Sequence, residues 1–279
     1  MAAHDTVFRR PLLATERTDF DVGAERLAFD LARRGGYSLA AVMPLASNAE
    51  FEAVAPALAE RADREAAARL DRLRAQARDA GVELDLGVRH GDEPCAEIVD
   101  DARERGADLI VIRRRGRRSF LASLMVGEMV GKVIAHAPCS VLVVPRDAQP
   151  WQRRVLVAVE PDALGRRVAA LATAVAAEAA LPLTALCVLG TGAARAEAQS
   201  WLGELQRGAA AAGVQAEALV LEGAPATQIL DAVRRTGADL IVMGMRGQAH
   251  AQRAKLGKVA YEVTGRFDGP VLLVGSAAP

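Results

Sequence analysis

The segment GADLIV at Gly106–Val111 occurs again, without a change, at Gly237–Val242, 131 positions further along the chain. Each copy enters a continuous apolar run, Leu109–Ile112 in the first and Leu240–Met243 in the second. Apolar runs of this length are typical of strands in a parallel sheet whose two faces are both covered by helices. The repeated segment therefore predicts two copies of one α/β domain.

The similarity extends outward from this segment to both ends of each copy. Near the start of the chain, Pro11–Glu16 matches Val155–Glu160 at an offset of 144, so the second copy lacks about 13 residues in between. The prolines and polar residues of Pro145–Pro150 suit a linker, and we expect domains at residues 1–147 and 148–279. Two further pairs of segments match, Ala80–Val82 with Ala212–Val214 and Val141–Val144 with Val271–Val274.

Between these landmarks the pattern alternates strands and helices. Such alternation predicts a doubly wound parallel sheet with right-handed crossovers in each domain. Ligands bind such sheets at the carboxyl ends of the strands, so we expect functional loops after Thr15, Met43 and Ile112, and after Val159, Val188 and Met243. The elements of the first copy are strands at Leu12–Thr15, Leu39–Met43 and Val82–Val88, a helix from Ala24 to Gly35, a long helix from Phe51 towards Gly81, and a helix beginning at Pro94.

The composition excludes several classes of protein. With 51% apolar residues the chain can bury enough surface to fold, which excludes intrinsic disorder. The 35 basic and 35 acidic residues cancel, which argues against a general nucleic-acid binder. No apolar run approaches the roughly 18 residues of a membrane span, and the N-terminus lacks a secretion signal. We expect a cytoplasmic protein that does not associate with membranes.

The cysteines and histidines are dispersed along the chain. Cys95, Cys139 and Cys187 are far apart and form no C-x-x-C pair, so we expect small buried side chains in a reducing compartment. The four histidines are equally scattered, and their spacing builds no metal site.

A glycine-rich loop follows the repeated strand in the second copy. The strand runs into Gly244-Met-Arg-Gly247, and after nine more residues Gly257 precedes a predicted helix at Lys258–Thr264. Glycines let the backbone approach a ligand closely, and a helix N-terminus attracts anions. The G-x2-G-x9-G spacing resembles the nucleotide-binding motif of the universal stress protein family, in which Ser or Thr follows the last glycine. The stretches Gly237–Gly247 and His136–Val144 carry the same resemblance, which covers both copies.

The resemblance implies two tandem, doubly wound α/β domains, each a five-stranded parallel sheet in the order 3-2-1-4-5 with about four helices. It also implies ATP or AMP, with Mg²⁺ accompanying ATP, at the strand ends of many members, although other members bind no nucleotide. Members of the family pair through their last strands. Here this implies pairing of Val141–Val144 with Val271–Val274, or a homodimer of the chain.

The second copy keeps all three glycines but departs from the family at other positions. Lys258 replaces the hydroxyl residue, and it either partners a bound phosphate or extends into solvent at a decayed site. Glu160 stands where the family has an Asp near the adenosine, and Val188 lies where the second strand borders the adenine. The nucleotide-binding residues that this predicts are Gly244, Arg246, Gly247, Gly257, Lys258, Glu160 and Val188.

The first copy departs further and is expected not to bind nucleotide. Arg113 replaces the first glycine, and ten residues instead of nine separate Gly116 from Gly127. Glu128 follows, and its carboxylate would repel a phosphate at that helix N-terminus. The degenerate counterpart of the site comprises Glu16, Val42, Arg113, Gly116, Gly127 and Glu128.

The basic run Arg113–Arg118 has three interpretations. It could contact phosphate or nucleic acid, although no aromatic platform accompanies it except Phe120. It could consist of solvated arginines or ion-pair partners at an interface. In the third interpretation, Arg113 lies across the empty first-copy site.

The sequence favours a non-catalytic regulator. It contains no G-x-S-x-G nucleophile elbow and no P-loop, and no residue marks a general base. We expect a stress-response protein that binds ATP or AMP in its second domain. The alternatives are a protein-interaction scaffold that binds no nucleotide and, less favoured, a slow ATPase.

Overall fold

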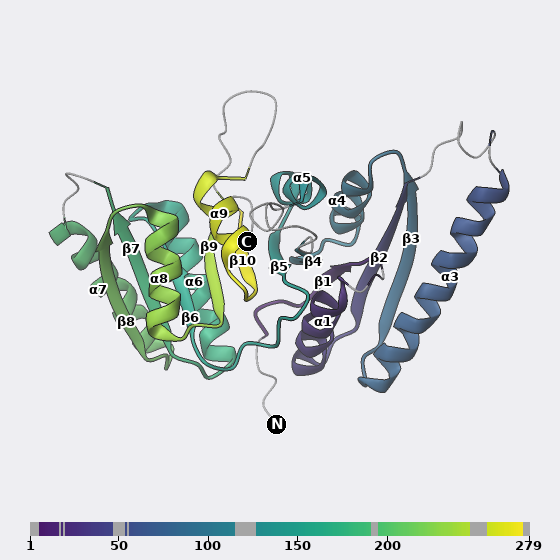
Figure 1. Cartoon of the computed structure of the whole chain (residues 1–279). Helices are drawn as coiled ribbons and strands as arrows, with labels where there is room; N and C mark the ends of the chain where they lie inside the picture. Colours follow the sequence, from purple (N-terminus) through teal and green to yellow (C-terminus); the bar gives the residue numbers. More distant parts are fainter. Residues whose placement is uncertain are drawn as a thin grey trace. The chain divides into compact units, whose positions relative to one another are not determined.

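The computed structural model describes residues 6–16, 18, 20–46, 54, 56–114, 127–190, 195–245 and 256–275. These residues form two α/β units (Figure 1). Phe8–Arg114 and Gly127–Gln149 make up the unit termed here the first domain, and Pro150–Gly275 make up the second. The division between Gln149 and Pro150 falls within the linker Pro145–Pro150.

The first domain is a parallel sheet flanked by helices. Its strands lie in the order β3-β2-β1-β4-β5. Its elements are β1 (Pro11–Ala14), α1 (Val22–Gly35), β2 (Leu39–Ala46), α3 (Pro56–Asp79), β3 (Leu84–Gly91), α4 (Pro94–Glu104), β4 (Leu109–Arg113), α5 (Glu128–His136) and β5 (Ser140–Val144).

The second domain repeats this arrangement in the order β8-β7-β6-β9-β10. Figure 1 shows α8 on one face of this sheet and α6 and α7 on the other. The predicted α/β class, the five parallel strands and the 3-2-1-4-5 order are confirmed in both domains. The elements are β6 (Val155–Ala158), α6 (Ala163–Glu178), β7 (Leu183–Leu189), α7 (Arg195–Ala211), β8 (Ala216–Glu222), α8 (Pro225–Thr236), β9 (Leu240–Gly244), α9 (Lys258–Arg266) and β10 (Val271–Val274).

The aspartate of each GADLIV segment precedes the fourth strand of its domain and accepts hydrogen bonds from the residues just before the first strand. Asp108 accepts the backbone N–H groups of Arg9 and Arg10, the shorter bond being 2.7 Å. Asp239 accepts the equivalent N–H groups of Arg153 and Arg154 just before β6, and in addition that of Gln152 at 2.8 Å. Because each carboxylate ties the chain before the first strand to the fourth strand, the repeated segment sets the same register in both domains.

The local signals at helix ends are also confirmed. α1 ends at Gly35, and Gly36 closes it in the left-handed region with φ of 65°. Gly237 closes α8 in the same way with φ of 71°. Glycine adopts this conformation without the steric cost that a side chain imposes. Pro94 and Pro225 begin α4 and α8, where a missing N–H costs nothing.

One predicted boundary is wrong in a way that affects the site. β2 does not end at Met43 but continues through Pro44 to Ala46. β1 reaches only as far as Ala14, which pairs with Val42, so no β1 residue stands opposite Pro44. Proline is therefore tolerated at this position of an inner strand, where it would otherwise remove a ladder hydrogen bond.

Candidate functional site

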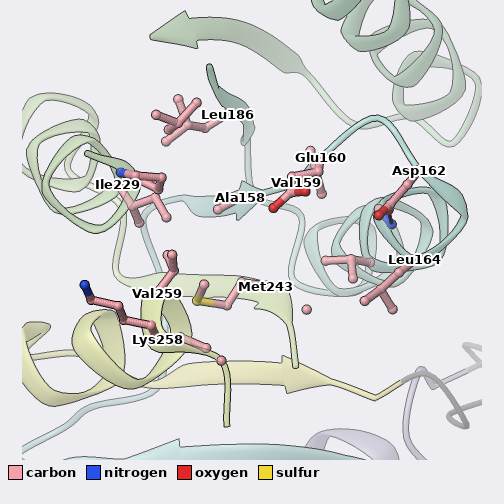
Figure 2. Close-up of a pocket in the computed structure, with 17 residues that line it drawn as sticks. Ala158, Val159, Glu160, Asp162, Leu164, Leu186, Ile229, Met243, Lys258 and Val259 are labelled. Atoms are coloured by element: carbon pink, nitrogen blue, oxygen red, sulfur yellow. Dashed lines mark hydrogen bonds between the residues drawn. The ribbon is translucent and has the colours of Figure 1, made fainter. Parts of the chain in front are cut away.

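A cavity of about 230 Å³ opens at the carboxyl ends of β6, β7 and β9 in the second domain (Figure 2). The first residues of α6, α8 and α9 border it as well. This is the edge of a doubly wound sheet where the strand order reverses and where ligands bind. Its volume lies somewhat below the range of about 300–1,000 Å³ that is typical of small-molecule sites.

The wall of the cavity is mostly apolar. Leu186 and Val188 come from β7, Ile229 from α8 and Met243 from β9 (Figure 2). Side chains two residues apart on a strand share a face, which explains why Leu186 and Val188 both border the cavity. An apolar wall with a few polar groups at its mouth is typical of sites for flat organic ligands.

Two carboxylates lie in the turn between β6 and α6. Glu160 is exposed and borders the cavity. Asp162 is the N-cap of α6 and accepts the Gly165 N–H at 2.7 Å, so one of its oxygens is engaged in the cap. Burial and the nearby Glu160 charge together raise the pKa of the Cys187 thiol.

The N-terminus of α9 supplies the positive side of the cavity. Gly257 is the N-cap and makes no side-chain cap, and the next three residues, Lys258–Ala260, all border the cavity. The first N–H groups of a helix lack partners within the helix and carry a partial positive charge. The exposed ammonium of Lys258 adds a full charge at the same end.

Two glycines beside the cavity are in close contact with neighbouring atoms, Gly165 with the backbone of Glu160 and Gly244 with the side chain of Leu164. A Cβ on Gly165 would lie 1.9 Å from the carbonyl oxygen of Glu160, which no side chain could accommodate. A Cβ on Gly244 would lie 3.0 Å from Cδ2 of Leu164, a tight contact with a movable side chain. Asp162, Leu164 and Gly165 were not predicted from the sequence, although an Asp just before a helix is a recognisable capping signal.

The equivalent place in the first domain has a different shape. Beside Glu16 and Arg113 a pocket of only about 10 Å³ remains. A separate cavity of about 560 Å³ lies towards the start of α5, and Glu16, Arg113, Gly127 and Glu128 are among its lining residues. The strand register establishes the equivalence, because Ala14 pairs with Ile112 as Ala158 pairs with Met243.

The Arg113 side chain fills this place. Its Nη2 lies 2.7 Å from Oε2 of Glu16, and its Nη1 donates to Oγ1 of Thr18 at 2.9 Å. Its Nε lies 3.4 Å from Oδ1 of Asp21. The third interpretation of the basic run, with Arg113 across the first-copy site, is therefore the one that the structure shows for this residue. Arg115–Arg118 and Phe120 lie outside the described residues.

The remaining predicted residues lie as follows. Glu128 is the first residue of α5, with Gly127 as its N-cap, and its carboxylate is 3.7 Å from Lys132. Val42 is fully buried and pairs with Ala14, as Leu186 pairs with Ala158, so the register counterpart of Val188 is Pro44. Pro44 lines the small cavity of the first domain. Gly116, Arg246 and Gly247 lie outside the described residues.

Two other features are absent from the described part of the chain, a metal-binding cluster and a membrane-spanning helix. It contains no cluster of three or more His, Cys, Asp or Glu side chains that could hold a metal ion. Its helices include none with both the length and the apolar character to cross a membrane. All three cysteines are buried free thiols, which confirms the prediction of their burial.

Comparison with known proteins finds one family throughout. Among curated proteins, 66 residues are 41% identical to the universal stress protein YxiE of Bacillus subtilis, covering 24% of this chain and 45% of that protein. A segment of 78 residues is 38% identical to MJ0531 of Methanocaldococcus jannaschii, covering 28% of this chain and 46% of that protein. The matched segments thus span less than half the length of these curated relatives.

A solved structure extends the likeness of fold to nearly the whole chain. A universal stress protein from Archaeoglobus fulgidus superposes with a TM-score of 0.79 over 97% of both chains, at 17% identity. The model of the universal stress protein family matches residues 8–145 and again 152–275. The chain therefore belongs to the universal stress protein family and contains two domains of that family in tandem.

Proposed function

We propose that this chain is a non-catalytic stress-response regulator that binds an adenine nucleotide, ATP or AMP, in its second domain alone. The observation that carries the proposal is the difference at the strand position beside the carboxylate that both domains share. Gly244 leaves the second-domain cavity open beside Glu160, whereas the Arg113 guanidinium pairs with Glu16 in the first domain and Glu128 adds a negative charge at the start of α5. One nucleotide would then bind to each chain.

The lining of the open cavity suits the parts of such a ligand. Adenine would pack on the apolar wall of Leu186, Ile229 and Met243. The Glu160 carboxylate, which lines the cavity, would accept hydrogen bonds from ribose hydroxyls. The phosphates would lie at the start of α9, where backbone N–H groups and the Lys258 ammonium supply positive charge.

Magnesium would accompany ATP through the phosphates. The described residues gather no cluster of carboxylates for it, and Mg²⁺ is commonly held by one or two carboxylates together with phosphates and water. The second-domain residue that fits such a role is Glu160, because Asp162 is engaged in capping α6.

Two alternatives remain distinct. In the first, Lys258 marks a decayed site, both cavities are without nucleotide, and the paired domains serve as a protein-interaction scaffold. In the second, Glu160 activates a water molecule and the protein hydrolyses ATP slowly. The family consists generally of non-catalytic stress proteins. Membership alone therefore supports neither ATP hydrolysis nor the binding of one particular ligand.

A single preparation separates these functions. The purified protein is denatured, and the supernatant is analysed by nucleotide chromatography. Thermal unfolding is then followed with AMP, and with ATP and Mg²⁺. Binding raises the midpoint, and calorimetric titration should give one site per chain. No released nucleotide and no change in midpoint would leave the scaffold. Hydrolysis above that of a Gly257→Val variant would support the ATPase.

We also propose that the two domains pair through their last strands, Val141–Val144 with Val271–Val274, and that the chain acts in the cytoplasm. Paired cysteines in the two strands should form an intramolecular disulfide under mild oxidation, detected by mass spectrometry of peptides. The pair is Val144→Cys/Val271→Cys if the strands run antiparallel and Val144→Cys/Val274→Cys if they run parallel. Light scattering of the native protein will show whether the chain also forms a homodimer.

A further inference from the structure

The first domain holds a compact set of groups around one guanidinium. Glu16, Thr18 and Asp21 lie between the end of β1 and the start of α1, and each contacts Arg113, the last residue of β4. The distances are 2.7 Å to Glu16, 2.9 Å to Thr18 and 3.4 Å to Asp21, each from a different nitrogen of Arg113. The planar fork of guanidinium is thus engaged along all its edges, which a single ammonium group could not reproduce.

Burial makes the cation necessary. The Asp21 side chain is 1% exposed and that of Arg113 is 14% exposed. The backbone N–H and the hydroxyl of Thr18 both donate to Oδ2 of Asp21 at 2.7 Å. Its Oδ1 accepts no hydrogen bond and faces the Nε of Arg113. A carboxylate buried without a nearby cation is strongly unfavourable, so Asp21 depends on Arg113.

An aromatic ring completes the surroundings. The Cζ atom of Arg113 lies 6.0 Å from the centroid of the Phe20 ring, and that of Arg146 lies 5.9 Å from it. A ring at this distance attracts a cation, and arginine more often than lysine. Two carboxylates, a hydroxyl and a ring therefore surround the guanidinium of Arg113.

We propose that Glu16, Thr18, Phe20 and Asp21 form a guanidinium-binding site in the first domain, which Arg113 fills from within the same chain. The first domain thus carries an internal ligand beside Glu16, the counterpart of Glu160 at the open cavity of the second domain. The chemical class that this site recognises is the guanidinium cation. The proposal does not depend on nucleotide binding in the second domain.

Removal of the internal ligand should create a site for an added one. In the full chain, Arg113→Ala should increase amide hydrogen exchange in peptides covering β1 and the start of α1 by about tenfold or more, because Asp21 loses its cation. Ethylguanidinium at millimolar concentration should restore protection in a saturable manner. Ethylammonium at the same ionic strength should not, because it lacks the fork. Trp151 and Trp201 both lie in the second domain, so tryptophan fluorescence provides an internal control for a fold that is otherwise intact.

The outcomes are decisive in either direction. Unchanged exchange in Arg113→Ala, or equal recovery with ethylammonium, would overturn the proposal. If Arg113→Ala does not accumulate as folded protein, Arg113→Lys takes its place, since it keeps the charge and loses the fork. Faster exchange of β1 in Arg113→Lys supports guanidinium recognition, and exchange equal to that of the unaltered protein overturns it.

Discussion

The Nη2 atom of Arg113 lies 2.7 Å from Oε2 of Glu16, whereas beside Glu160 of the second domain the equivalent strand position is Gly244. Both residues end their strands, with Arg113 opposite Val144 and Gly244 opposite Val274. The first domain thus has a side chain where the second has none. Because the carboxylate is kept in both copies, the space beside it is open in the second domain, whereas the Arg113 guanidinium occupies it in the first.

Substitution of Gly244 by arginine should close the second cavity. The new guanidinium would reach Glu160 as Arg113 reaches Glu16, and affinity for ATP measured by calorimetry should fall by about tenfold or more. Gly244→Ala is the matched control, because its Cβ requires only a small shift of the Leu164 side chain. Wild-type affinity in Gly244→Arg would show that the cavity is not the nucleotide site.

The two loop glycines before α5 and α9 should respond differently to the same change. Gly257 and Gly127 have nearly identical backbone angles, with φ of −59° and −58°, so valine is compatible with either backbone. Gly257→Val places a side chain at the open cavity and should abolish the ATP-induced rise in unfolding midpoint. Gly127→Val should leave that rise unchanged. An equal loss in both variants would contradict the asymmetry between the domains.

Lys258 should contribute to phosphate binding by charge. We expect Lys258→Gln to weaken ATP binding by about tenfold at low salt. The effect on AMP should be smaller because AMP carries less charge, and both effects should shrink at high salt. Lys132→Gln is the matched control, since Lys132 lies near Glu93 and Glu128 in the first domain. Identical affinities for Lys258→Gln and the unaltered protein would indicate that this lysine extends into solvent.

Gly165 should be required for the stability of the second domain. Its Cβ would overlap the Glu160 carbonyl oxygen, so Gly165→Ala should destabilise by about 1–3 kcal/mol. Gly208 lies within α7 with open space around its Cβ position, and Gly208→Ala should stabilise by about 0.5–1 kcal/mol. Urea unfolding followed by tryptophan fluorescence measures both. Equal stabilities would indicate that α6 can move away from Glu160.

The stability of the protein should fall at alkaline pH in part because of one thiol. Burial raises the pKa of Cys139 from 9.0 to about 12. As the pH rises, the unfolded chain loses the Cys139 proton before the folded protein does. The protonated thiol therefore contributes fully to the free energy of unfolding below pH 9.0, and this contribution is lost as the pH rises towards about 12. Cys139→Ala should make the decline in unfolding free energy shallower by up to about 1.4 kcal/mol per pH unit. Cys95→Ala should change the slope less, and the same slope in all three proteins would exclude this origin.

The sheets could be predicted from the sequence because their strands are buried on both faces. Runs such as Leu109–Ile112 and Val141–Val144 have no polar face, and they coincide with β4 and β5 to within one residue. The boundary of β2 was missed since proline discourages a strand assignment. Pro44 fits in β2 only because the neighbouring strand β1 ends at Ala14 and leaves no partner opposite the proline. The residues around Pro44 do not reveal where β1 ends.

The site was predictable where its residues end strands and begin helices. Glu160, Val188, Gly244, Gly257 and Lys258 all border the open cavity, because parallel strands bring their carboxyl ends to one edge. Several residues that the sequence did not reveal come from the turn before α1 and from the N-cap and first turn of α6. Their distance from the sites depends on how those helices pack on the sheet. This packing cannot be predicted from the spacing of residues along the chain. They are Thr18, Phe20, Asp21, Asp162, Leu164 and Gly165.

The pairing of Arg113 with Glu16 would also limit how the protein responds to a nucleotide bound in the second domain as proposed. Cooperative binding within a chain requires two sites that influence each other. Here the Arg113 guanidinium stands beside Glu16, where the second domain is open beside Glu160, so the proposal gives a single nucleotide site in each chain. The second domain would therefore fill along a simple hyperbola, and occupancy would follow the cellular nucleotide level gradually. A threshold response would have to come from association of several chains, in which copies of the same open cavity communicate across an interface.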